Sequence, residues 1–257
     1  KFCCNRIDPQ SIEEDIRSRM KITVKLNGET AKVGPPEWGS GPDYFSFWSH
    51  FLGALFAVFA TIQLLSIQGA SVEKQVACLI YGACAVMMLS CSALHHAVQK
   101  PVSLPIQLLL RRWDHVSIYV FIAGSYTPIM VGSNLGLYTS RTILTAVWVL
   151  AVIGVCQKLF FNFSTMRYVT ISTYICQGWA CIFALPQLRA TFGDDLQLLV
   201  AGGLFYSVGA FVYASKRPNL WPNTIGFHGL WHIFVLLGAF CHYRFVLLHI
   251  MGNAVVV

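Results

Sequence analysis

Long apolar stretches separated by short polar connections make up most of the chain after residue 43. Seven of them are apparent, at about 45–67, 76–97, 115–134, 141–160, 168–187, 196–214 and 225–248. Each has close to the roughly 20 residues that an α-helix needs to cross the hydrocarbon of a bilayer. The pattern therefore predicts an all-α, polytopic membrane protein, with a seven-helix transmembrane domain over residues 44–257.

The first 43 residues are polar and form a separate part of the sequence. The run from Pro9 to Glu14 is typical of a helix start, and the alternation from Ile22 to Gly28 predicts a short β-hairpin. Pro35 and Pro36 end this part. We expect residues 1–43 to be a small segment on the cytosolic side of the membrane.

Composition and charge agree with a membrane protein and indicate its orientation. Of the 257 residues, 56% are hydrophobic and 11% are charged, which is far more apolar than a soluble domain requires. Fourteen of the 18 lysines and arginines precede the first stretch or lie at or beyond the ends of the second, fourth and sixth: Lys1, Arg6, Arg17, Arg19, Lys21, Lys25, Lys32, Lys100, Arg111, Arg112, Lys158, Arg167, Lys216 and Arg217. The positive-inside rule then predicts a cytosolic N-terminus and an external C-terminus. Basic residues at helix ends, rather than on one face of a soluble domain, argue against nucleic-acid binding.

A few polar side chains stand out because ionisable groups at membrane depth are costly and default to functional sites. Ser92 and His96 end the second stretch, Asp114 opens the third, and His228 and His232 open the seventh. The orientation places all of them in the cytosolic half of the bilayer. Spacings of four residues put Ser92 with His96, and His228 with His232, on one helix face each.

Three neutral imidazoles suit zinc and leave a fourth position for water, which bound zinc makes acidic enough to react near neutral pH. Asp114 is then a candidate general base, and Ser92 a candidate donor to the water or to a substrate carbonyl. Other interpretations stay open. An isolated intramembrane histidine is usually a hydrogen-bonding residue between helices, and an aspartate beside Arg111 and Arg112 is often an interfacial ion pair.

The remaining histidines are weaker candidates for the same site. His95 points about 100° away from His96 on a helix, so we expect it to pack or to face solvent. His242 lies about 15 Å along the helix from His232, too far to share an ion. His50 opens the first stretch, where packing is favoured over a supporting or substrate-binding role.

Several segments together resemble the progestin and adipoQ receptor family, most of all its hemolysin III branch. They are Ser49-His50, Ser92-Ala93-Leu94-His95-His96, Asp114 with Gly124-Ser125-Tyr126-Thr127-Pro128, His228-Gly229-Leu230-Trp231-His232, and Cys241-His242-Tyr243. The resemblance implies a seven-helix bundle with its N-terminus inside and zinc near the cytosolic face. It also implies His96, His228 and His232 as the ligands, with Asp114 and Ser92 around the bound water. The tandem histidines depart from the pattern and leave His95 as an alternative ligand.

The superfamily also contains alkaline ceramidases, so the resemblance implies a zinc-dependent hydrolase acting on an amide bond of a membrane lipid, ceramide-like or otherwise containing a fatty acid. The alternative is a membrane receptor of the adiponectin or progestin type, or a regulator of membrane lipids, with structural zinc and no turnover. A pore-forming cytolysin has no support, because no ring of charged residues lines a pathway. We expect an integral protein of the plasma membrane rather than of an internal membrane.

Overall fold

The computed structural model describes residues 22–26, 29–33, 44–98, 104–133, 135–160, 167–222 and 224–252. The chain divides into two compact units, Lys1–Gly41 and Pro42–Val257. In the first unit, β1 (Ile22–Leu26) pairs antiparallel with β2 (Glu29–Val33). This pairing confirms a hairpin that starts at Ile22, but its second strand lies beyond Gly28, where the predicted hairpin ended. The helix start expected at Pro9 to Glu14 lies outside the described residues.

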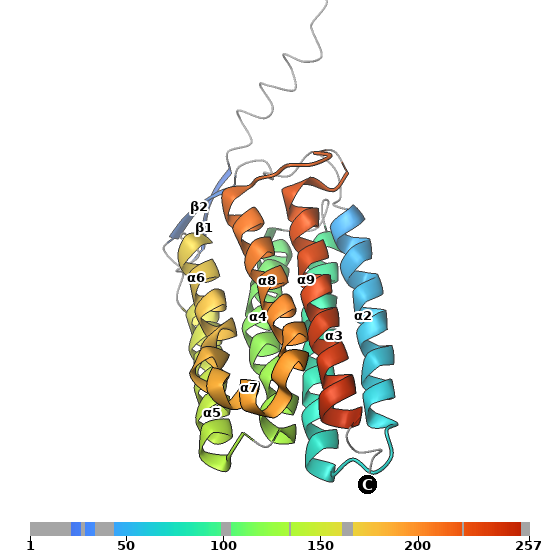
Figure 1. Cartoon of the computed structure of the whole chain (residues 1–257). Helices are drawn as coiled ribbons and strands as arrows, with labels where there is room; N and C mark the ends of the chain where they lie inside the picture. Colours follow the sequence, from blue (N-terminus) through green and yellow to red (C-terminus); the bar gives the residue numbers. More distant parts are fainter. Residues whose placement is uncertain are drawn as a thin grey trace, which may run out of the picture. The chain divides into compact units, whose positions relative to one another are not determined.

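The second unit is a helical bundle in which successive long helices reverse direction (Figure 1). Its elements are α2 (Tyr44–Leu65), α3 (Val72–Ala97), α4 (Leu104–Gly132), α5 (Leu137–Phe160), α6 (Arg167–Gly178), the 3-10 turn η2 (Ala180–Ala184), α7 (Leu185–Phe192), the 3-10 turn η3 (Gly193–Leu196), α8 (Gln197–Ser215), α9 (Gly226–Phe245) and the π-helical turn η4 (Val246–Met251). The reversals bring the end of α3 and the beginnings of α2, α4 and α9 to one end of the bundle (Figure 1).

Within the described residues, six helical segments are long and apolar enough to cross a membrane. Five correspond to single predicted stretches. The other, Tyr168–Ser215, is a run of 48 residues that contains the fifth and sixth predicted stretches. It descends as α6, turns at α7 and returns as α8 (Figure 1). The count of seven spans and the side on which each terminus lies stay predictions.

Two helix boundaries differ from the predicted stretches for physical reasons. Helix α4 begins at Leu104 rather than near residue 115, because the charged residues Arg111, Arg112 and Asp114 interrupt the apolar pattern inside the helix and separate its mostly apolar first turns from the rest. Helix α6 ends at Gly178, well before residue 187. There the hydroxyl of Tyr126 donates to the carbonyl of Gly178 at 2.6 Å and accepts from the amide of Cys181 at 3.0 Å. These bonds satisfy backbone groups that the helix break leaves without intrahelical partners.

Helices α2 and α9 approach each other closely through two glycines. A Cβ atom at Gly53 would lie 2.6 Å from Cδ2 of Leu236, and one at Gly229 would lie 2.7 Å from Cδ1 of Phe45. Small residues at such contacts let helix backbones pack tightly in membranes. Because Gly53 and Gly229 each lie three residues from a buried histidine, His50 and His232, they also bring those two imidazoles together.

Candidate metal centre

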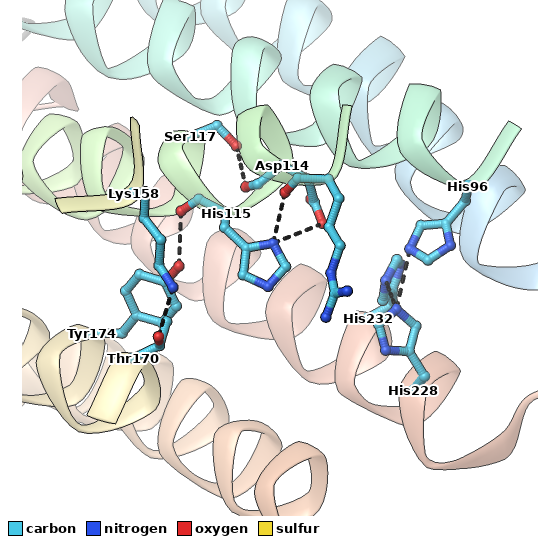
Figure 2. A network of polar contacts seen from close by, with 10 residues as sticks. His96, Asp114, His115, Ser117, Lys158, Thr170, Tyr174, His228 and His232 are labelled. Atoms are coloured by element: carbon cyan, nitrogen blue, oxygen red, sulfur yellow. Dashed lines mark hydrogen bonds and ion pairs between the residues drawn. The ribbon is translucent and has the colours of Figure 1, made fainter. Parts of the chain in front are cut away.

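Three imidazoles converge on one point at the end of the bundle shared by α3 and α9. Nε2 of His228 lies 3.1 Å from Nε2 of His96 and 3.1 Å from Nε2 of His232 (Figure 2). Their candidate ligand atoms all lie within 4.8 Å of one another. His96 and His232 are buried and His228 is half-buried. Helix α3 supplies His96 in its last turn, and α9 supplies the other two from adjacent turns.

Hydrogen bonds among the three imidazoles do not account for this arrangement of their Nε2 atoms. A ring nitrogen of a neutral imidazole offers either one N–H or one lone pair, never both. Nε2 of His228 therefore forms at most one hydrogen bond, although two other Nε2 atoms approach it equally closely. A cation at the point of convergence accepts a lone pair from each nitrogen, so the donor set fits a metal ion better than it fits a hydrogen-bonded cluster.

The spacing of the nitrogens also suits a tetrahedral ion. Zinc binds histidine nitrogen at about 2.0–2.1 Å, which for tetrahedral angles separates two ligand nitrogens by about 3.3 Å. The two 3.1 Å separations in this cluster are close to that value. Three ligands would leave one position of a tetrahedral ion open, as in catalytic sites.

The tandem histidines are distinguished by their positions on α3. His96 belongs to the cluster, and His95 does not. The ring of His95 is half-buried, with its centroid 5.0 Å from that of His96. Adjacent residues on a helix point in different directions, so one of the pair turns away from the convergence point.

Asp114 and Ser92 meet each other rather than joining the ligand cluster. The Asp114 side chain is 14% exposed, and it lies beside the Ser92 side chain, which interacts with it. Ser92 is buried and lies one turn before His96 on α3. In the described part of the chain, the one ion-pair contact of Asp114 is with Nδ1 of His115 at 3.9 Å.

A polar network beside Asp114 ties three helices together (Figure 2). Nδ1 of His115 donates to the Arg111 carbonyl at 2.8 Å, and the Tyr174 hydroxyl donates to the His115 carbonyl at 2.8 Å. Nζ of Lys158 donates to the Thr170 hydroxyl at 2.7 Å. No sequence pattern indicates this network, because its members are spread over α4, α5 and α6 with no characteristic spacing.

A fourth imidazole lies against the cluster. The ring of His50, from α2, stacks on the ring of His232 with a centroid distance of 3.7 Å and an interplanar angle of 21°. The neighbouring Ser49 places its hydroxyl 3.4 Å from Nδ1 of His232. The sequence favours packing for His50 over a supporting or substrate-binding role. The sequence does hold a signal for a functional role: His50 is an ionisable residue within an apolar stretch, at the same membrane depth as the predicted ligands.

A bundle of apolar helices with a buried three-histidine cluster at one end defines a polytopic membrane protein with a candidate metal centre. The family model for Haemolysin-III related proteins matches residues 42–243. The chain therefore belongs to this family of integral membrane proteins, as its resemblance to the hemolysin III branch indicated.

Individual relatives agree with this assignment. The protein is 32% identical over 211 residues to "Hemolysin-3" from Bacillus cereus, a match covering 80% of this chain and 90% of the relative. It is 33% identical over 196 residues to a "Hemolysin-3 homolog" from Bacillus subtilis (strain 168), covering 74% and 86%. It is also 21% identical over 216 residues to the "Adiponectin receptor protein" of Drosophila melanogaster, covering 77% of this chain and 48% of that protein.

Proposed function

We propose that the protein is a zinc-dependent hydrolase that cleaves an amide bond of a membrane lipid, in the manner of a ceramidase. The convergence of the three Nε2 atoms of His96, His228 and His232 carries this proposal. A carboxylate and a hydroxyl, from Asp114 and Ser92, lie at the same end of the bundle. Ligands, a candidate base and a hydrogen-bond donor are together the minimum set for metal-assisted hydrolysis.

Each residue has a distinct part in the proposed reaction. The histidines would hold the ion, and zinc bound there would supply a Lewis acid that makes water nucleophilic near neutral pH. The Asp114 carboxylate accepts a proton as the water oxygen bonds to the amide carbonyl carbon. That proton passes to the nitrogen as the C–N bond breaks, which releases a fatty acid and an amine. Ser92 keeps the carboxylate oriented through the interaction of their side chains.

A lipid substrate is supported by the surroundings of the site. Large apolar side chains are exposed on the helices that carry it, among them Trp48 on α2, Leu94 on α3 and Trp113 on α4. In a bilayer these side chains face acyl chains rather than water. A substrate with long acyl chains therefore reaches this end of the bundle by lateral diffusion, whereas a water-soluble amide has to cross the interface.

The test is turnover by the purified protein in lipid nanodiscs, with mass spectrometry of free fatty acid and sphingoid base. His228→Ala, expected to be free of metal, is the blank. Asp114→Asn should keep its metal, because the ligands are unchanged, but lose activity by about 10²–10⁴-fold, the usual contribution of a positioned base. Wild-type activity equal to the blank across several amide and ester lipids would refute the hydrolase proposal.

A second candidate function is that of a receptor or a regulator of membrane lipids in which the metal is structural. The similarity to the Drosophila adiponectin receptor favours it. The same experiment separates the two functions. Stoichiometric metal without any product supports the second, whereas product formation that depends on the metal supports the first.

A further inference from the structure

His50 is a buried imidazole whose position is not explained by hydrogen bonds among the described residues. It is 2% exposed, and neither ring nitrogen has a hydrogen-bond partner of normal geometry within the described part of the chain. A buried polar side chain normally obtains such partners, since leaving a donor or acceptor unpaired costs about 1–3 kcal/mol. Some other interaction must therefore favour an imidazole at this position.

The His50 ring is related to the cluster in a different way from how the three cluster rings are related to one another. The rings of His96, His228 and His232 are inclined to one another by 51–71°, so that their nitrogens point to a common centre. The ring of His50 lies nearly parallel to that of His232, at 21° and 3.7 Å. A parallel ring presents its face rather than a nitrogen lone pair, so His50 is not placed as a fourth ligand.

This stacking geometry becomes favourable when His232 carries positive charge. Two neutral aromatic rings prefer an offset or edge-to-face arrangement to a close face-to-face one. An imidazole that ligates a divalent cation, however, shares part of its charge, and cations are attracted to the face of an aromatic ring. A metal ion on Nε2 of His232 would therefore be stabilised through the ring by the facing His50.

We propose that His50 is a positioning residue of the metal centre, with its ring face fixing the plane of His232 and stabilising the charge that His232 acquires on binding metal. Ser49 completes this support from the same helix, with its hydroxyl beside Nδ1 of His232. The close approach of α2 and α9 at Gly53 and Gly229 provides the short separation that stacking needs. The inference rests on the metal site of the proposed function but not on its turnover.

Metal affinity of the full chain in nanodiscs tests the proposal, measured by zinc competition with a chelator and by the visible spectrum of the cobalt-substituted protein. His50→Phe keeps an aromatic face and removes both nitrogens, whereas His50→Gln keeps a polar group and removes the face. We expect His50→Gln to weaken zinc binding by about 10–100-fold, as for other residues that support metal ligands, and to alter the cobalt spectrum. His50→Phe should stay within about threefold of the wild type.

The matched control is His242→Gln, the same change at an imidazole ten residues beyond His232 on α9. It should lower thermal stability equally with and without metal and leave zinc affinity unchanged. If His50→Gln behaves like this control, His50 only packs and the proposal is wrong. Equal losses of affinity in His50→Phe and His50→Gln would also overturn it, because the ring face would not be the cause. His50→Leu, which also lacks the face, replaces the glutamine variant if that does not fold.

Failure of this inference is distinguishable from failure of the proposed function. If the wild-type protein binds zinc and hydrolyses lipid but His50→Gln has unchanged zinc affinity, only the role proposed for His50 is refuted. If the wild-type protein binds zinc without turnover and His50→Gln binds zinc more weakly, the hydrolase proposal is refuted and the role of His50 is supported. A wild-type protein that binds no zinc or cobalt overturns both.

Discussion

The replacement His228→Ala tests the metal centre at its central member. Nε2 of His228 is the atom that lies 3.1 Å from both of the other cluster nitrogens. Its removal leaves His96 and His232, with ring centroids 4.9 Å apart. Two imidazoles from different helices hold an ion far less tightly than three, and an unfilled space remains on the α9 side of the site.

The expected size of the effect follows from linkage between binding and stability. Metal at 1,000 times its dissociation constant stabilises the folded protein by about 4.1 kcal/mol, and a 1,000-fold weaker variant gains only about 0.4 kcal/mol from the same metal. For a domain of this size, 1 kcal/mol corresponds to about 2–4 °C in melting temperature. The metal-dependent rise in melting temperature should therefore fall from roughly 8–16 °C to about 1–2 °C.

Metal analysis by plasma emission and thermal unfolding with and without zinc provide the measurement. His95→Ala is the matched control, because His95 adjoins a cluster member on α3 but lies outside the cluster. It should keep about one zinc per chain and the full thermal shift. Equimolar zinc and an unchanged shift in His228→Ala would refute the ligand assignment, and zinc lost from His95→Ala but kept by His96→Ala would exchange the tandem pair.

Three further predictions concern the rest of the bundle. Ser92→Ala should lower lipid hydrolysis less than Asp114→Asn does, because water can replace part of one hydrogen bond; steady-state rates that reverse this order would contradict the roles proposed for the two residues. Tyr126→Phe removes two hydrogen bonds at the break after α6 and should cost about 1–3 kcal/mol in unfolding free energy, whereas Tyr138→Phe, at an 84% exposed position, should have no measurable effect. Terminal tags in sealed cells should be protease-protected at the N-terminus and accessible at the C-terminus, and the opposite pattern would show that the predicted orientation is wrong.

The apolar pattern predicted the helices well because hydrophobic length is a local property of the sequence. It was less successful where charged residues interrupt a helix, as Arg111 and Arg112 do in α4, or where a side chain from another helix satisfies a break, as Tyr126 does after Gly178. The second boundary depends on Tyr126, which lies about 50 residues away in the sequence, so no local pattern indicates it.

The sequence alone determined the membrane character of the chain and the set of histidines at one end of the bundle. Alternating helix directions bring the end of one apolar stretch and the beginning of the next together, whatever the detailed packing. The tertiary structure decided which ring nitrogens converge, that Ser92 meets Asp114, and that His50 stacks on His232. These contacts depend on the rotation of each helix and on its distance from its neighbours. Close approaches at small residues such as Gly53 and Gly229 set the rotation and the spacing of the helices, and no local sequence pattern indicates these approaches.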